Sequence, residues 1–213
     1  MSDELEKYYR QFEAIKCDAH GLLEGLADGQ LGWHPGAGSW SIADCLNHLV
    51  VTGNESLPRI RSAISEAHSR KLFSNDSSRH SVLGKLLIRW MDAPPKIKFK
   101  APKAYMPVLN LPVAEIVEKF FLLQDAMLTE LREANGINLA RVKVTNPVSK
   151  WWKMSLGEEF ALTAAHERRH LWQGWRVREK IGLACPPSPS NQPFVFDGTI
   201  SRPAELKRGH RGN

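Results

Sequence analysis

The chain has 213 residues and a net charge of +6, with 42% hydrophobic and 24% charged residues. These proportions are typical of a globular protein with one good-sized domain, and no apolar run approaches the roughly 20 residues that a membrane span needs. The N-terminus lacks the apolar core of a signal peptide, and three widely spaced cysteines (Cys17, Cys45 and Cys185) argue against a disulfide framework. We therefore expect a cytoplasmic protein.

The net charge also bears on partners. Four basic and two acidic side chains follow Gly182, so the tail carries +2 of the +6 and the body carries +4. A body charge of this size, without a clustered basic face, does not indicate binding to nucleic acid.

Apolar residues recur at spacings of three and four over residues 4–27, which predicts a first helix there. Asp28-Gly29 is expected to stop it. Residues 29–40 contain four glycines and a proline, so they predict an ordered loop. We expect Trp33 and Trp40 in that loop to plug one end of the core.

A second helix is predicted to begin at Ser41, because Ser is a favourable N-cap and Asp44 follows three residues later. His48 lies within the apolar stripe of this helix. The helix is expected to run to about His68, with a kink or a break at Pro58.

The middle of the chain, residues 69–111, has the least regular pattern. It predicts a short helix around 80–91 and then an extended crossover, partly packed through Phe99, Tyr105 and Met106. Pro112 is expected to open a third helix, where its missing N–H costs nothing. That helix should end near Ala134, and a loop should span 137–154.

A fourth helix is predicted over Leu156 to Ile181, because Ser155 followed by Glu158 forms a capping-box pattern. His166 and His170 are four residues apart and so lie one turn apart on one face. The same face carries Leu162, Gln173 and Val177, which indicates that it points inward.

Four long amphipathic helices joined by one long crossover predict an all-α protein, a four-helix bundle. We expect the bundle domain to span residues 1–182. Residues 183–213 contain five prolines and a basic end, and they predict an extended or disordered tail.

Two imidazoles stacked on one helix face can chelate a divalent metal, and a catalytic site commonly adds a third protein ligand. His48 is the best candidate for that ligand, because it lies on the inner face of another long helix. The alternative is a core histidine bonded to a backbone carbonyl. Cys45 could reach the same core, although a buried cysteine is more often a small hydrophobe. Glu167 lies about 100° around the helix from His166, so we expect it to pair with a surface arginine or to cap a neighbouring helix.

Two motifs in this chain resemble those of the DinB-like superfamily of metal-dependent four-helix bundles, which is related to the bacillithiol and mycothiol transferases. The first is Trp40-Ser41-Ile42 followed by Leu46-Asn47-His48-Leu49, and the second is His166, His170 and Gln173. Asn146-Pro147 and Ser155-Leu156-Gly157 also match the approach to the last helix. The resemblance covers about residues 4–181. The crossover at 94–107 and the tail from 183 depart from the pattern.

The resemblance implies that His48, His166 and His170 hold a divalent metal ion, zinc or nickel above all, and that the protein is a homodimer. It favours a thiol-dependent transferase that uses a low-molecular-weight thiol and a small-molecule substrate. From the charge and the lack of a long apolar run, we expect neither nucleic acid nor a membrane as partner. Two alternatives stay open: a metal-dependent hydrolase using metal-bound water, and a helical binding or scaffold protein with a structural metal. The sequence names no residue that moves a proton.

The composition of the tail leads to a first prediction. Truncation after Gly182 should change the free energy of unfolding by no more than about 1 kcal/mol, the usual scale for changes outside the core. Thermal unfolding of the truncated and full-length chains tests this. A large loss of stability, or of an oligomer, would show that Phe194-Val195-Phe196 docks on the bundle or on a second chain.

Overall fold

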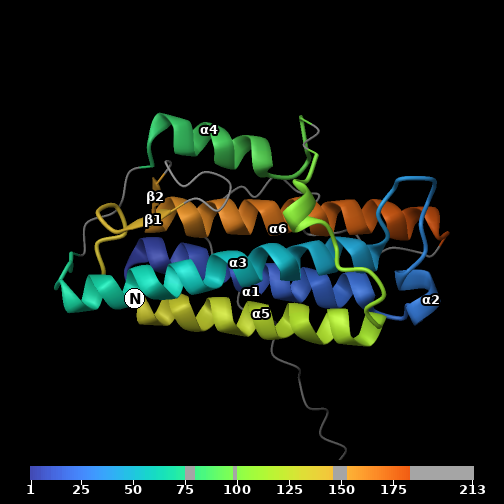
Figure 1. Cartoon of the computed structure of the whole chain (residues 1–213), viewed down its shortest axis with the longest axis horizontal. Coiled ribbons are helices and arrows are strands. Elements are labelled where there is room, and N and C mark those ends of the chain that lie inside the picture. The colour runs from blue at the N-terminus through green and yellow to red at the C-terminus, as the bar shows by residue number, and fades with distance from the viewer. Residues whose placement is uncertain (75–79, 98–99, 146–152, 183–213) are drawn as a thin grey trace, which may run out of the picture.

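A computed structural model describes residues 1–74, 80–97, 100–145 and 153–182. The protein is mostly helical, which confirms the predicted all-α four-helix bundle (Figure 1). Its elements in chain order are α1 (Asp3–Leu23), α2 (Asp28–Leu31), α3 (Ile42–Ser69), α4 (Val82–Met91), the 3-10 helix η1 (Lys103–Tyr105), α5 (Val113–Glu133), β1 (Lys143–Thr145), β2 (Lys153–Ser155) and α6 (Leu156–Lys180).

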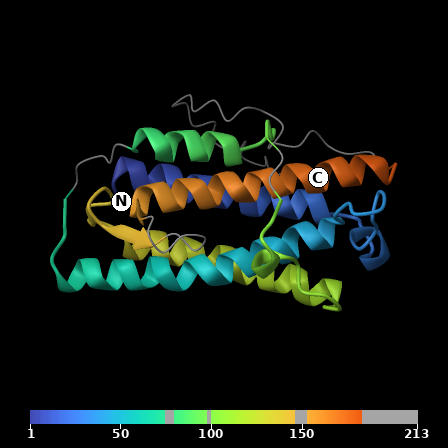
Figure 2. The ribbon, with the colours of Figure 1, turned by 45° about the horizontal axis from the view of Figure 1, so that its top comes forward.

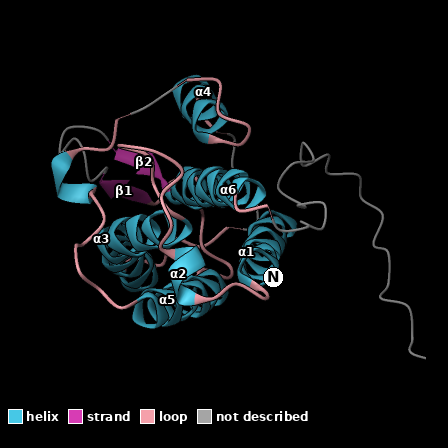
Figure 3. Cartoon of the chain, turned by 90° about the vertical axis from the view of Figure 1, so that its right-hand side faces the viewer, coloured by secondary structure: helices cyan, strands magenta, loops and turns pink. Residues whose placement is uncertain are grey.

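The four long helices α1, α3, α5 and α6 form the bundle, with α1 diagonally opposite α3 and α5 diagonally opposite α6. Both α1 and α3 pack against α5 and α6, as the view along the bundle shows (Figure 3). Asp18 bonds to Trp175 and the Gly21 carbonyl to Arg178, so α1 and α6 run in the same direction. The seam between α3 and α6, which run antiparallel, carries the candidate site.

The long crossover lies outside the bundle. It leaves α3, includes α4 on the outer side of α6, and then passes through η1, which packs against α3, before it enters α5 (Figure 2). In the described part of the chain, no helix has the length and apolarity that crossing a membrane would require.

The predicted capping box at the start of α6 is confirmed. The Ser155 hydroxyl accepts the Glu158 N–H, and the Glu158 carboxylate accepts the Ser155 N–H at 2.9 Å. The same carboxylate also accepts the Ser81 N–H at 2.7 Å and so ties the start of α4 to the start of α6. Burial alone would raise the pKa of Glu158, but these hydrogen bonds outweigh burial and lower it to about 2.

Two expectations for the first half of the chain are wrong in detail, and a third is settled in part. The first helix ends at Leu23 rather than at residue 27, because Gly25 adopts a φ of 71° that a helix cannot continue. Asp28 opens the short helix α2 instead of stopping a helix. Of the kink or break expected at Pro58, the break is excluded, because α3 continues through this residue. This side of the helix is exposed, so water can satisfy the carbonyl that proline leaves unpaired.

The tryptophans and the last connection also differ from expectation. Trp33 is 41% exposed and plugs nothing, while Trp40 lies against the histidines described below. The segment predicted as a loop over 137–154 contains an antiparallel hairpin in which Lys143 pairs with Ser155. Each strand has only three residues, too few for an alternating pattern to be visible in the sequence. Phe99 and Trp151-Trp152 lie outside the described residues.

Close packing of α3 on α5 leads to a second prediction. A Cβ added to Gly53 would meet the Leu123 side chain at 2.2 Å, so Gly53→Ala should destabilise the bundle by roughly 1–3 kcal/mol. Gly21→Ala in α1 is the matched control, because its Cβ would meet only Trp175, at 3.8 Å. There the better helix propensity of alanine should leave stability unchanged or raise it by up to about 1 kcal/mol. Denaturant unfolding distinguishes the two, and equal stability of both variants would contradict the close approach of α3 and α5.

Candidate metal centre

Three histidines from two helices converge in the seam between α3 and α6. His48 comes from the second turn of α3, and His166 and His170 come from successive turns of α6. The Nε2 atom of His166 lies 3.1 Å from Nε2 of His48 and 3.1 Å from Nε2 of His170. The potential ligand atoms of the three residues all lie within 4.8 Å of one another. The structure therefore brings together the three residues that the sequence singled out.

The other ring nitrogen of His48 fixes which of its nitrogens carries the proton. Nδ1 of His48 lies 2.6 Å from the backbone carbonyl oxygen of Tyr105. A carbonyl oxygen only accepts, so Nδ1 carries the proton, and in the neutral ring Nε2 keeps its lone pair. The two interpretations of His48 hold together: it is a core histidine bonded to a carbonyl, and that bond turns its lone pair toward the other two histidines.

One cation satisfies this arrangement better than a shared proton does. The Nε2 atom of His166 faces two other ring nitrogens, but it has either one proton or one lone pair to offer them. Zinc holds imidazole nitrogen at about 2.0–2.1 Å in tetrahedral geometry, which places two ligands roughly 3.3 Å apart. The observed spacing of 3.1 Å is close to that value. The donor set fits a divalent ion that accepts neutral nitrogen ligands, as zinc and nickel do.

Burial keeps all three imidazoles neutral. It lowers the pKa of His166 to about 3, with the charges of His48 and Arg169 adding to the effect. Burial likewise lowers the pKa of His170 well below its ordinary value. It also lowers the pKa of His48, although the hydrogen bond to the Tyr105 carbonyl opposes this shift. A metal competes with protons for a free imidazole near pH 6.5, so these lowered pKa values move the loss of metal affinity to a pH below 6.5.

Aromatic and amide side chains surround the histidines. The Trp40 ring lies 4.9 Å from the His48 ring and 5.5 Å from the His170 ring, measured between centroids. Gln173, one turn after His170, lies close enough to raise its pKa slightly against the effect of burial. His166 and Trp40 are only partly buried, so the site borders solvent on their side.

Cys45, the other candidate ligand, and two further histidines do not join this group. Within the described residues, the three histidines are the one cluster of side chains that could hold a metal. Cys45 is buried, and burial raises the pKa of its thiol, which suits a small hydrophobe rather than a ligand. His34 contacts the Ser39 carbonyl in its loop, and His20 stacks on Phe121.

The expectation for Glu167 is wrong. Glu167 is 2% exposed, and its carboxyl group lies beside Gln124 of α5 rather than on the surface. Burial raises its pKa to about 8, although Gln124 and the charge of Arg168 oppose this. Sequence reasoning missed it because α6 is enclosed on several sides by α1, α3 and α4, so a residue 100° away from the histidines still faces the core.

A second buried carboxyl group, which the sequence did not indicate, lies on the histidine face. Glu159 is seven residues before His166, two turns away on the same side of α6, and is 4% exposed. No partner for its Oε2 atom is found in the described ranges. Burial raises its pKa to about 7, against the opposing charge of Arg59.

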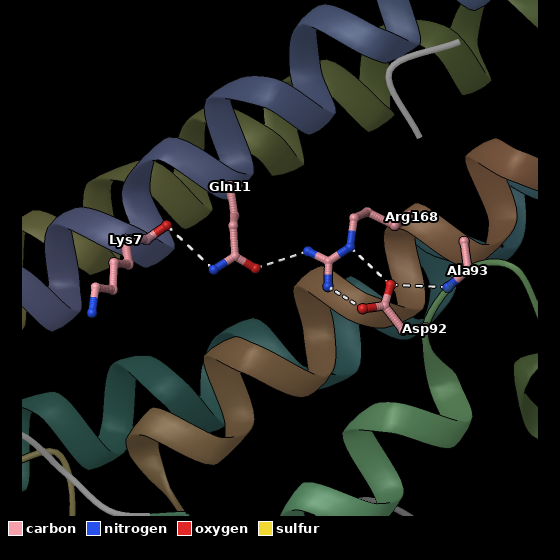
Figure 4. Close-up of polar contacts among 5 residues, drawn as sticks. All are labelled: Lys7, Gln11, Asp92, Ala93 and Arg168. Atoms are coloured by element: carbon pink, nitrogen blue, oxygen red, sulfur yellow. Dashed lines mark hydrogen bonds and ion pairs between the residues drawn. The ribbon is translucent and has the colours of Figure 1, made fainter. Parts of the chain in front are cut away.

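The two arginines between the histidines hold the crossover. The Arg168 guanidinium binds the Asp92 carboxylate through two bonds of 2.8 Å and donates a third to Gln11 of α1, whose amide reaches the Lys7 carbonyl (Figure 4). Arg169 donates to the backbone carbonyls of Trp90 and Ile97 at 3.1 and 2.6 Å. The sequence pattern could not indicate these contacts, because the partners lie far apart in the chain. Arg169, for example, is 79 positions from Trp90 and 72 from Ile97.

The fold and the site together define a four-helix bundle with a three-histidine centre between its second and last long helices. Residues 11–173 match the family model of the DinB superfamily, so the chain belongs to that superfamily. Among solved structures it is similar to YfiT from Bacillus subtilis, a probable metal-dependent hydrolase with an unusual four-helix bundle topology. The TM-score is 0.59 at 15% identity, over 86% of this chain and 91% of that one, so this likeness supports the fold. No curated protein matches the sequence.

The buried carboxyl group of Glu159 leads to a third prediction. Because folding raises its pKa from about 4.5 to about 7, the folded protein holds this proton more tightly than the unfolded chain, and stability falls as pH rises through that window. In metal-free protein, Glu159→Gln should leave stability unchanged near pH 4 and raise it by on the order of 2 kcal/mol near pH 8.

The exposed Glu66 of α3 supplies the control. Glu66→Gln should change the free energy of unfolding by less than about 0.5 kcal/mol at both pH values. Denaturant titrations at the two pH values measure the difference, and a pH-independent effect of Glu159→Gln would show that its carboxyl group titrates normally.

Proposed function

We propose that the protein is a metal-dependent enzyme that activates a small nucleophile at His48, His166 and His170. The observation that carries this proposal is the convergence of three Nε2 atoms from two helices, with His48 held in the tautomer that a metal ligand needs. Membership of the DinB superfamily and the likeness to a probable metal-dependent hydrolase support a divalent metal at this place.

The three histidines would hold the ion, and none of them needs to move a proton. Their pKa values lie below the ordinary imidazole range, so they are neutral near pH 7 and ready to bind. In the described part of the chain no carboxylate or thiolate joins the group, which leaves a tetrahedral ion one position for a substrate. This open position favours catalysis over a purely structural metal.

The charge of the site favours an anionic nucleophile. Because three neutral ligands leave the charge of a divalent ion uncompensated, such an ion would lower the pKa of a thiol or a water and supply a nucleophile near neutral pH. We favour a low-molecular-weight thiol, which makes the protein a thiol-dependent transferase acting on a small electrophile. The resemblance of the two histidine motifs to the family of bacillithiol and mycothiol transferases supports this choice.

Hydrolysis is the second candidate. The likeness to YfiT favours it, because that protein is a probable metal-dependent hydrolase. The two reactions would use the same histidines and differ in the nucleophile, so the ligand that occupies the open position distinguishes them.

Cobalt substitution provides the test and a fourth prediction. The protein should bind one Co²⁺ per chain with visible absorption bands, and His48→Ala should weaken binding under competition with a chelator because one of three ligands is lost. His68→Ala is the matched control, since His68 lies on the same helix but is exposed and contacts the Glu133 carbonyl. Addition of a thiol that binds the ion should add an intense near-ultraviolet charge-transfer band.

The outcomes separate the alternatives. No band with any common cellular thiol, together with unchanged visible bands, would reject the transferase and leave the hydrolase or a binding protein with a structural metal. Equal cobalt affinity of His48→Ala and the unaltered protein would show that the third ligand is wrong. No cobalt binding by the unaltered protein would reject the metal-dependent enzyme altogether.

A further inference from the structure

The crossover contacts two consecutive residues of α3. The Asn47 amide N–H donates to the Val108 carbonyl at 2.7 Å, and the Asn47 amide oxygen accepts the Val108 N–H at 3.3 Å. His48, the next residue, donates its Nδ1–H to the Tyr105 carbonyl at 2.6 Å. Asn47 is 3% exposed, so its two bonds to one backbone unit are shielded from water.

The start of the crossover is fixed by the ligand-bearing helix. Arg168 binds Asp92, and Arg169 binds the carbonyls of Trp90 and Ile97. Arg168 and Arg169 separate the two histidines of α6 in the sequence. The crossover is thus attached to α6 near its start and to α3 near its end. Along the chain, the Tyr105 carbonyl that bonds to His48 lies between Ile97, which bonds to Arg169, and Val108, which bonds to Asn47.

We propose that Asn47 is a positioning residue for the metal ligand His48, and that it acts through the crossover. By holding the Val108 backbone, Asn47 keeps the Tyr105 carbonyl, three residues earlier, at Nδ1 of His48. That bond sets both the ring orientation and the position of the proton, and so leaves Nε2 free to bind metal. The inference rests on the proposed function for its effect on metal affinity, but its effect on the His48 tautomer stands without metal.

The first variant is Asn47→Leu, which keeps the branching of the side chain at Cγ and removes both hydrogen bonds. The matched control is Ser56→Ala, which removes a buried hydrogen bond to the Thr52 carbonyl of the same helix without touching the crossover. Zinc affinity is measured by chelator competition. We expect Asn47→Leu to weaken binding by about 10- to 100-fold, the range found when a partner of a ligating histidine is lost, and Ser56→Ala to change it less than about threefold. Asn47→Ala serves as a second variant if the leucine does not fold, and the same direction is expected.

A double-mutant cycle tests whether Asn47 acts through His48. In a His48→Ala background, Asn47→Leu should change zinc affinity by less than about twofold, because the ligand that it positions is already gone. In metal-free protein, nitrogen-15 NMR should show the His48 Nδ1–H tautomer in the unaltered chain and in Ser56→Ala, and a mixture of tautomers in Asn47→Leu.

Three results would overturn the proposal: unchanged zinc affinity in both Asn47 variants, the same fold-loss with and without His48, or an unchanged His48 tautomer. If the unaltered protein binds neither zinc nor cobalt, the proposed function fails, and the NMR comparison alone decides whether Asn47 positions His48.

Discussion

The confinement of three neutral imidazoles to one point between α3 and α6 is the constraint on which the rest of the structure depends. Nε2 of His166 lies 3.1 Å from Nε2 of His48 and 3.1 Å from Nε2 of His170. A buried nitrogen atom that lost its partners would destabilise the fold by roughly 1–3 kcal/mol. The seam must therefore be rigid, because a small slide of one helix past the other would separate the nitrogens. The capping box at Ser155, the bond from Glu158 to Ser81, and the parallel contacts of α6 with α1 all fix the position of α6 along the bundle.

Helix α6 also contains two buried carboxyl groups. Glu159 and Glu167 are both more than nine-tenths buried, and neither makes an ion pair among the described residues. Burial raises the pKa of each, so each destabilises the metal-free fold near neutral pH. A divalent ion held by neutral ligands would bring positive charge into the same core. Burying two carboxyl groups destabilises a core that has only to be stable. A cation in the same core would attract the ionised carboxylates and so reduce this destabilisation.

Helices, caps and the histidine cluster could be predicted from the sequence because each depends on residues close together in the chain. The spacing of His166 and His170, and the position of His48 on an apolar stripe, give the direction of each side chain once a helix is assumed. What could not be predicted depends on contacts between distant residues. The buried position of Glu167 follows from helices packed on several sides of α6, and the bond from His48 to Tyr105 joins residues 57 positions apart. The short strands β1 and β2 carry too few residues for any period to show.

The five residues His166-Glu167-Arg168-Arg169-His170 point from one turn of α6 toward three different parts of the structure. Residues four apart point the same way, so the two histidines face α3, while the residues between them point about 100° apart in succession. Glu167 turns into the core beside Gln124, and the two arginines turn outward to Asp92 and to backbone carbonyls of the crossover. The crossover then returns to α3 and bonds to His48. His48 is thus linked to His166 and His170 through the crossover, which is hydrogen-bonded to both helices, so a substitution in the arginines or in Asn47 would affect the site without contacting it.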